Sequence, residues 1–379
     1  MRKQFAVAVP IFCSAMVCHA QSSVTLYGTL DTGITYTNNQ GGGATWQENS
    51  GSRGASKWGL RGTEDLGDGY AAIFTLEGAI SSTTGAMLGN REFGRYAYVG
   101  LTGPIGTLTL GRQYDLAIDY DQGLTDALRF GGALATHAGD VDNLWGTYEL
   151  DNGIKYTTPT IHGFSAATMV SLGGVAGDPS RNSAYEFGAG YRGGPLRLGA
   201  TYLNLRDPAV SLYGAATAPA TGETFTNPIT NPIFSGYVSA NRMQVASVGG
   251  LYAIGASTVG VQYSLTLFDD MVHTAATPNT DSARFSNVEV SYMYQFTPFA
   301  DAGIAYDYTS AASTAHYSQI NFGAQYNLSK ATFLYFITAW QHASGQNSLG
   351  KPAVAAISTL SASTTANQLA MRIGIRHSF

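Results

Sequence analysis

Cysteine, charge and long apolar runs are scarce in this chain of 379 residues. The two cysteines, Cys13 and Cys18, both lie close to the amino terminus. Charged residues make up 12% of the chain, about half the usual share of a soluble domain. Beyond residue 20 no apolar run reaches the roughly 18 residues from which a membrane helix is inferred. A disulfide framework and a bundle of membrane helices are therefore excluded as the basis of the fold.

The amino terminus has the pattern of an export signal. Residues 1-20 begin with Arg2 and Lys3, continue with an apolar run and end in small residues ahead of Gln21. This pattern predicts a cleaved signal peptide over 1-20 and a single domain over 21-379. Without the two charges of the signal, 18 basic residues face 25 acidic ones, which gives a mature net charge of -7. That sign argues against a nucleic-acid partner.

The carboxyl terminus has the pattern of a strand with one apolar face. Successive side chains of a strand point to opposite sides, and residues 369-379 alternate strictly. One face carries Leu369, Met371, Ile373, Ile375, His377 and Phe379. The other face carries Arg372 and Arg376. Taken alone, this strand fits either an outer-membrane β-barrel or the edge of a soluble sandwich.

The same period of two recurs along the chain, for example over 24-36, 259-267, 288-296, 302-308 and 320-328. Tight turns join several strand pairs, and longer polar segments lie near 38-54, 79-92, 115-149, 173-184, 206-241, 269-283, 309-316 and 343-366. Short turns at one end and eight long loops at the other predict an all-β, transmembrane antiparallel β-barrel of about 16 strands. A barrel of that size leaves an aqueous channel.

Five segments resemble the general Gram-negative porins, in the branch typical of β-proteobacteria. They are SVTLYG at 23-28, SKWGLRGTEDLGDGY at 56-70, GTLTLGRQ at 106-113, DNGIKYTTP at 151-159 and GIRHSF at 374-379. The resemblance spans the mature chain in family order. It implies an outer-membrane homotrimer of sixteen-stranded barrels, each with a water-filled channel that a third loop, folded inward, narrows. It also implies that Phe379 is the signal read by the outer-membrane assembly machinery.

The third long loop, 115-149, is rich in acidic residues. Candidates for an acidic wall of the constriction are Asp115, Asp119, Asp121, Asp126, Asp140 and Asp142. If the loop folds into the lumen, as the resemblance implies, these carboxylates would face the channel. The alternative for each is a solvated charge on an external loop.

Candidates for the opposite, basic wall lie on the predicted strands. Lys57 and Arg61 share one face, while Trp58 and Leu60 take the lipid side. Arg372 and Arg376 share the polar face of the last strand. Arg95 has the parity of Ala97, opposite to Tyr96 and Tyr98. An acidic loop facing a basic wall would create a transverse field that sorts ions by sign.

Two residues near the third loop complicate this picture. Glu149 stands where family members often carry a base, which, with the net negative charge, puts anion selectivity in doubt. Arg112 has the parity of the lipid-facing Leu108 and Leu110, so we expect either a β-bulge that redirects it or a role in holding the loop. The direction of ion selectivity stays open at this point.

The predicted function is passive diffusion of ions and small hydrophilic solutes, with a substrate-selective channel as the alternative. The expected partners are two further copies of the chain, outer-membrane lipid and lipopolysaccharide, and the assembly machinery. We predict no enzyme, no cofactor and no metal site, because the histidines are scattered and no metal-binding spacing occurs.

Overall fold

The computed structural model describes residues 22–221, 223–279, 281–312 and 314–379. The predicted signal peptide lies outside the described residues. The strands are β1 (Ser23–Gln40), β2 (Gly43–Ser50), β3 (Lys57–Gly67), β4 (Tyr70–Ala79), β5 (Tyr96–Gly103), β6 (Gly106–Gln113), β7 (Leu150–Thr157), β8 (Phe164–Ser171), β9 (Ala184–Gly193), β10 (Leu196–Arg206), β11 (Ala240–Ile254), β12 (Ser257–Met271), β13 (Ala283–Thr297), β14 (Ala300–Ala311), β15 (Ala315–Asn327), β16 (Thr332–Gly345) and β17 (Asn367–Ser378).

The helical segments are short and lie in the connections between strands. They are α1 (Leu116–Tyr120), η1 (Gln122–Leu124), η2 (Ala127–Gly131), η3 (Gly132–Ala135), η4 (Ala138–Asp140), α2 (Pro208–Ser211) and η5 (Ser235–Tyr237). In the described part of the chain, no helix combines the length and the apolar character needed to cross a membrane.

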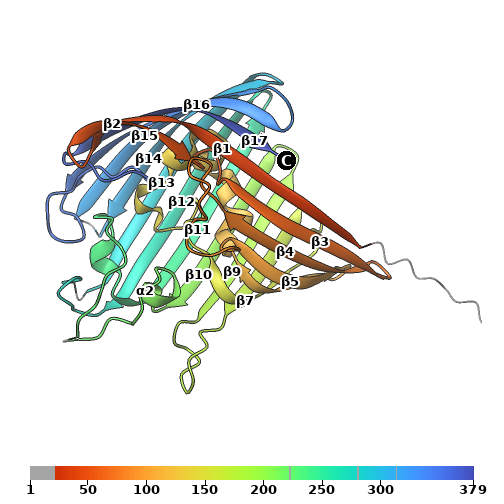
Figure 1. Ribbon diagram of the computed structural model, residues 1–379, viewed down its shortest axis with the longest axis horizontal. Coiled ribbons are helices and arrows are strands. Elements are labelled where there is room, and N and C mark those ends of the chain that lie inside the picture. Colours follow the sequence, from red (N-terminus) through yellow and green to blue (C-terminus); the bar gives the residue numbers. More distant parts are fainter. Residues whose placement is uncertain (1–21, 222, 280, 313) are drawn as a thin grey trace, which may run out of the picture.

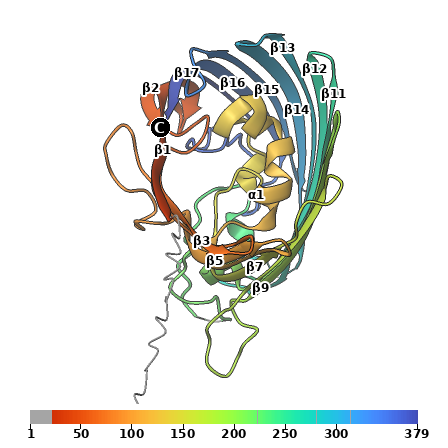
Figure 2. The same cartoon turned by 90° about the vertical axis from the view of Figure 1, so that its right-hand side faces the viewer.

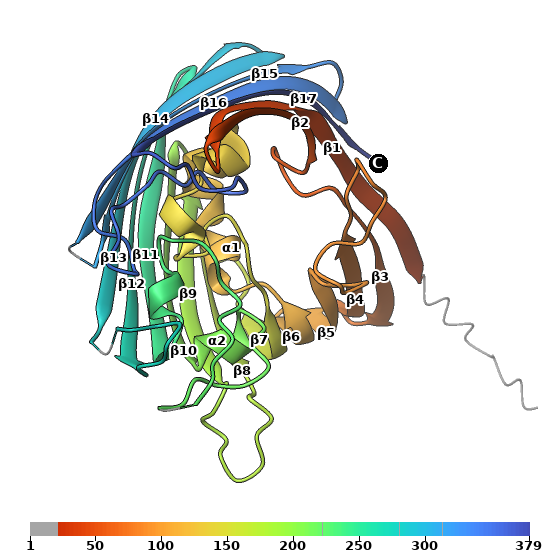
Figure 3. The same ribbon diagram turned by 60° about the vertical axis from the view of Figure 1, so that its left-hand side comes forward.

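The strands form one closed antiparallel barrel (Figures 1 and 3). Apart from β2 and β3, which both pair with β1, each strand pairs with its neighbours in sequence, and β17 closes the sheet against β1. One part of β1 pairs with β2 and the other with β3. Because β2 and β3 follow one another along β1, the 17 strand segments of the described residues occupy sixteen positions in the barrel. The predicted fold class is confirmed.

The barrel has its apolar side chains outside and its polar side chains inside. On the first and last strands, Val24 and Ile373 are 65% and 67% exposed, whereas Asp31 and Thr35 are only 0% and 2% exposed. An outward apolar face suits lipid, because every backbone group of a closed barrel is paired within the sheet. The alternation in the sequence therefore predicts correctly which side chains of these two strands point outward and which point into the barrel.

Two of the eight predicted long loops are tight connections. The segment 38-54 contains the end of β1, a turn at Gly41 and Gly42, and all of β2. Both glycines adopt positive φ values, 62° and 109°, which a two-residue hairpin turn requires. The segment 309-316 likewise consists mainly of strand residues, because β14 runs to Ala311 and β15 begins at Ala315. The polar residues of both segments predicted loops, but most of them belong to strands that continue beyond the predicted ends.

The third loop, residues 114–149 between β6 and β7, folds into the barrel as expected (Figure 2). Its α1 packs against β8, β9 and β10, while η2 and η3 pack against β14, β15 and β16. The loop thus follows the inner surface of the wall from β8 to β16. β1 and β3 lie on the other side of the lumen (Figure 2).

An apolar core lies inside the barrel, where a second connection, residues 207–239 between β10 and β11, packs beside the third loop. Val141 of the third loop and Ile233 and Tyr237 of this second connection are buried in one cluster with Phe268 and Phe285 of the wall. This core holds both connections in the barrel.

Candidate functional site

Carboxylates of the third loop fasten it to the inner wall of the barrel. Asp121 accepts hydrogen bonds from Thr201 of β10, at 2.9 Å, and from Ser247 of β11. Asp126 accepts from the side-chain amide of Asn321, at 2.8 Å. These hydrogen bonds are charge-assisted where the carboxylate is ionised, and such bonds are about twice as strong as neutral ones. The loop is therefore attached through the polar inner faces of the strands.

Two further carboxylates organise the loop itself. Asp115 caps α1 by accepting from the backbone N–H of Ile118 and also accepts from the Asn143 amide at 3.0 Å. Asp140 accepts from the backbone N–H of Trp145 at 3.0 Å. Burial raises the pKa of Asp115 and of Asp140 to about 7, with neighbouring acids adding to the effect.

These positions correct the predicted acidic wall of the channel. Asp115, Asp121, Asp126, Asp140 and Asp142 are at most 4% exposed, so their carboxylates do not face the channel water. Asp121, Asp126 and Asp142 turn toward the wall because the inner strand faces supply hydroxyl and amide donors. Asp115 and Asp140 instead accept hydrogen bonds from other residues of the loop.

Asp119 is the exception among the six predicted acidic residues. Its side chain is 36% exposed and forms an ion pair with Lys155 of β7, at 2.8 Å. The pair borders a recess of about 360 Å³ that Tyr96, Tyr98 and Tyr120 also line. The recess therefore combines one ion pair with aromatic side chains that carry hydroxyl groups.

Three of the predicted basic residues gather around one carboxylate that sequence reasoning missed. Glu77 of β4 is 3.0 Å from the ammonium of Lys57 and 2.7 Å from Arg95. The guanidinium of Arg61 lies 5.1 Å from the ring centre of Tyr27, whose hydroxyl donates to Glu77 at 2.9 Å. We call Lys57, Arg61, Arg95 and Glu77 the basic strip. Glu77 could have been recognised in the sequence, because it is the one charged residue in the stretch 70-80.

Arg95 joins the basic strip for a different reason from the strand alternation used to predict it. Tyr96 and Tyr98 face the lumen, where they line the recess beside Asp119, whereas Val99 and Leu101 point outward. Arg95 immediately precedes β5, so the alternation of the strand does not govern its direction. The predicted faces of this strand were therefore wrong, although the side chain of Arg95 does point inward.

Arg372 and Arg376 point inward as predicted, but Arg372 does not reach the channel water. Its side chain is fully buried and lies 3.3 Å from Asp31, with a further hydrogen bond of 2.8 Å to the Tyr335 hydroxyl. Arg376 is partly exposed and donates to the backbone carbonyl of Arg53 at 2.7 Å. The prediction of Arg372 as a channel-facing charge is wrong, because a buried acid on the adjacent strand binds it.

Arg53, a residue missed in the sequence, connects the barrel wall to the third loop. It lies in the interruption between β2 and β3, and its guanidinium donates to the carbonyls of Leu128 and Arg129, each at 3.1 Å. The backbone N–H of Ala133 also donates to the carbonyl of Ser52 at 2.7 Å. Burial, with Arg376 nearby, lowers the pKa of Arg53 to about 10. Gly51 and Gly54 could have indicated this interruption in the sequence, because glycine allows the chain to turn out of the sheet.

Arg112 sits at a β-bulge, one of the two expected solutions. The pairing of β6 with β7 shifts register between Gly111 and Gln113. The redirected guanidinium forms ion pairs of 2.7 Å with both Glu149 and Asp151. The acid at 149 therefore neutralises an arginine at the end of the third loop.

A closed barrel, apolar outside and polar inside, with a loop folded against its inner wall, is the architecture of a channel. A family model for Gram-negative porins matches residues 6–346. The chain belongs to the Gram-negative porin family. This porin is 29% identical to outer membrane porin protein 32 of Delftia acidovorans over the full length of both chains. It is 27% identical to the major outer membrane protein P.IB of Neisseria gonorrhoeae, covering 93% of this chain and 97% of that one.

A third relative is matched over part of its length. The porin is 33% identical to an outer membrane porin protein of Bordetella pertussis over 231 residues, which span 53% of this chain and 59% of that protein. Among solved structures, it superposes on an anion-selective porin from Comamonas acidovorans with a TM-score of 0.72 and 21% identity, covering 95% of this chain and all of that one. The protein is thus an outer-membrane porin that forms a channel for passive diffusion, as the sequence predicted.

Proposed function

We propose that the channel prefers anions, with the basic strip as one wall of its narrowest part and the third loop as the other. The observation that supports this is the asymmetry of exposed charge. The basic strip contains three cations and one carboxylate. On the facing loop, five of the six candidate carboxylates are buried, and Asp119 is paired with Lys155.

Such an asymmetry acts strongly in a narrow pore. A charged gap between low-dielectric walls concentrates the field and raises the local concentration of ions of opposite sign. With more cationic than anionic side chains at the gap, chloride should enter more readily than potassium. This assignment replaces the acidic loop facing a basic wall that the sequence suggested.

The test is the reversal potential of purified porin in planar bilayers under a KCl gradient. Arg61→Gln combined with Lys57→Gln should shift the potential toward cation preference, because two positive charges leave the gap. Asp119→Asn should shift it the other way. Arg206→Gln, at the end of β10 and exposed, is the matched control and should change nothing. An unchanged reversal potential in the double variant would overturn the assignment.

A substrate-selective channel is the second candidate function. The recess beside Asp119, Lys155 and three tyrosines could hold a solute with both charge and hydroxyl groups. Liposome swelling separates the two functions. Rates that fall smoothly with solute size indicate general diffusion, whereas saturable uptake of one solute class that Lys155→Gln abolishes indicates a binding site.

We also propose that the porin assembles as a homotrimer through the outer faces of β1, β2, β16 and β17. A groove there contains Ile34, Trp46, Leu334 and Ile373 together with the ionisable Glu48, which accepts from Thr32 at 2.9 Å. An ionisable side chain on an otherwise apolar outer face is costly against lipid, and a neighbouring copy would cover it. Glu48→Arg should then lower the yield of heat-resistant trimer on gels.

The outer surface and the carboxyl terminus support the remaining predicted partners. The exposed apolar band of the strands fits lipid, and the longer connections at one end fit the lipopolysaccharide leaflet. Phe379 is 54% exposed at the end of the chain, where the assembly machinery could bind it.

A further inference from the structure

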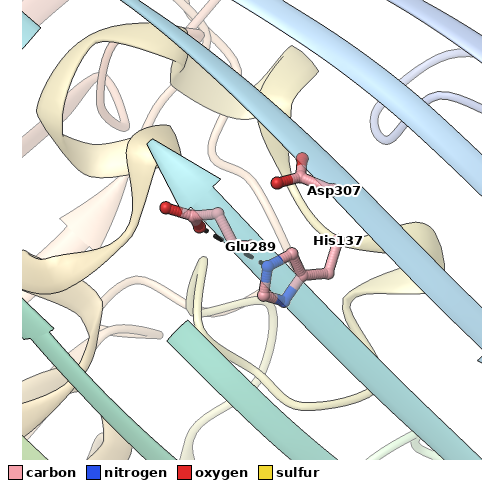
Figure 4. A group of neighbouring side chains, drawn as sticks. All are labelled: His137, Glu289 and Asp307. Carbon is pink, nitrogen blue, oxygen red and sulfur yellow. Dashed lines mark ion pairs between the residues drawn. The ribbon is translucent and has the colours of Figure 1, made fainter. Parts of the chain in front are cut away.

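Three side chains of types that can ligate a metal come together from distant parts of the chain, where the third loop meets the barrel wall. His137 belongs to the loop, Glu289 to β13 and Asp307 to β14 (Figure 4). One ligand atom from each residue lies within 4.8 Å of the others, and Nε2 of His137 is 3.5 Å from Oε2 of Glu289. All three side chains are at most 4% exposed.

In each residue, one polar atom is held by the protein and another has no hydrogen-bond partner among the described residues. Nδ1 of His137 is bonded to Asp142 at 2.7 Å, which leaves Nε2 free. Oε1 of Glu289 accepts from the backbone N–H of Asp126 at 2.8 Å, which leaves Oε2 free. Oδ2 of Asp307 accepts from Asn321, which leaves Oδ1 free. Buried polar atoms without partners are uncommon and require an explanation, of which a bound ion is one.

There is room for a small ligand beside His137 and Glu289, although Asp307 does not line this space. A cavity of about 10 Å³ is lined by His137, Glu289, Asp126 and Asp140. That volume is near the minimum for one bound water or ion. Asp126 also has an oxygen, Oδ1, without a partner among the residues described.

The charge of the cluster favours a cation. Asp126, Asp142, Glu289 and Asp307 are all buried around one histidine. Burying several carboxylates is costly unless a cation or protons neutralise them. A divalent ion would neutralise two negative charges and satisfy the free atoms together.

We propose that His137, Glu289 and Asp307 bind a divalent transition-metal ion of the zinc class, which clips the third loop to the barrel wall. Zinc accepts both imidazole nitrogen and carboxylate oxygen as ligands. Metal–ligand bonds of about 2.1 Å place neighbouring ligand atoms about 3.4 Å apart around a tetrahedral ion. The nitrogen and oxygen of His137 and Glu289, 3.5 Å apart, already have that spacing.

Asp142 has the position of a residue that orients a metal-bound histidine. Zinc-binding histidines usually donate their other ring N–H to a carboxylate, which fixes the tautomer. Asp142 is itself held by Asn287, at 3.1 Å, and by Ser264. The metal would displace the protons that the cluster otherwise holds, so binding should weaken in acid.

The experiment uses the native oligomer purified in detergent, stripped with a chelator and dialysed against Zn²⁺ or Co²⁺. We expect one zinc ion per chain by elemental analysis and a Co²⁺ absorption spectrum typical of a nitrogen and oxygen site. His137→Gln and Glu289→Gln should abolish both signals, and Asp142→Asn should weaken binding about 10 to 100-fold. His273→Gln, an exposed histidine on another loop, is the matched control and should bind normally.

Two outcomes would overturn the proposal. One is a wild-type porin that binds no zinc, which would mean that protons alone neutralise the cluster. The other is zinc that remains bound in His137→Gln, which would place it elsewhere. If the variants fail to fold, X-ray absorption on the wild-type zinc form still decides, because a first shell without an imidazole contradicts the site. Ion selectivity, measured on the same protein, tests the channel proposal separately.

Discussion

Arg372 and Asp31 form an ion pair of 3.3 Å in which neither side chain is exposed, and the pair joins the last strand of the barrel to the first. The pair is embedded in further hydrogen bonds, since Tyr335 donates to Asp31 at 2.6 Å. Removing one partner of such a pair leaves an uncompensated buried charge and typically costs about 3 to 5 kcal/mol. Arg372→Met should therefore lower the free energy of unfolding by about that amount.

The measurement is urea unfolding of the refolded porin in detergent, with a double-mutant cycle. Asp31→Asn combined with Arg372→Met should cost less than the sum of the single variants, because the double variant leaves no lone charge. Arg376→Met, which loses one hydrogen bond and is partly exposed, is the comparison. Additive costs would show that the two residues do not act as a pair.

Arg53 should control how firmly the third loop is held. Its guanidinium bonds to two carbonyls of the loop, and hydrogen bonds to charged groups contribute about 1.5 to 3 kcal/mol each. Arg53→Gln should loosen the loop near residues 128 and 129 and increase the noise of the open single-channel current. Arg61→Gln removes a charge without a bond to the loop, so it should change ion selectivity and leave the noise unaltered.

The pH dependence of the loop follows from Asp115 and Asp140. Burial raises the pKa of both from 3.8 to about 7, so the seated loop binds protons that a released loop would lose. The seated state is then fully favoured below about pH 4 and loses stability as pH rises to about 7.

Current noise of the chelator-stripped porin, recorded between pH 4.5 and 8, tests this dependence without any contribution from a bound metal ion. Noise should increase with pH and level off above about pH 7. Asp140→Asn, which keeps an acceptor for the Trp145 N–H, should flatten the curve. Asp119→Asn removes an exposed carboxylate and should leave the shape of the curve intact. Noise that rises on acidification would contradict the sign of the effect.

The barrel could be predicted from sequence because alternation reports directly which side of a strand meets lipid. Val24 and Ile373 on one face and Asp31 and Arg372 on the other follow the rule without exception. Alternation carries no information about residues just outside strands. Arg95 precedes β5 and Arg53 lies between β2 and β3, so their directions depend on tertiary contacts.

The electrostatics of the site were less predictable, because a count of charges does not say which ones are buried. The acids of the third loop look alike in sequence. Asp121 and Asp126 meet hydroxyl and amide donors of strands that are distant in the sequence, whereas Asp119 meets Lys155 at the exposed end of α1. The group of His137, Glu289 and Asp307 has no local spacing at all. Such sites become visible once the topology brings the strands together.

The carboxyl-terminal residue closes the barrel, and Gly28 makes room for it. Phe379 and Gly28 exchange two backbone hydrogen bonds of 3.0 Å. A Cβ atom on Gly28 would lie 2.4 Å from the ring of Phe379 and 2.8 Å from the carbonyl oxygen of Lys57. The second contact is with backbone, which cannot move aside easily. Gly28→Val should therefore destabilise the closure between β1, β3 and β17.

Comparing this variant with a Phe379 deletion separates closure of the barrel from recognition during assembly. If Phe379 is the signal for the assembly machinery, its deletion should lower the amount of porin in the membrane more than Gly28→Val does. Both variants should unfold at lower temperature after refolding from urea, since each disrupts the same strand junction. Equal membrane levels with equal losses of stability would mean that the terminal phenylalanine acts only by closing the barrel.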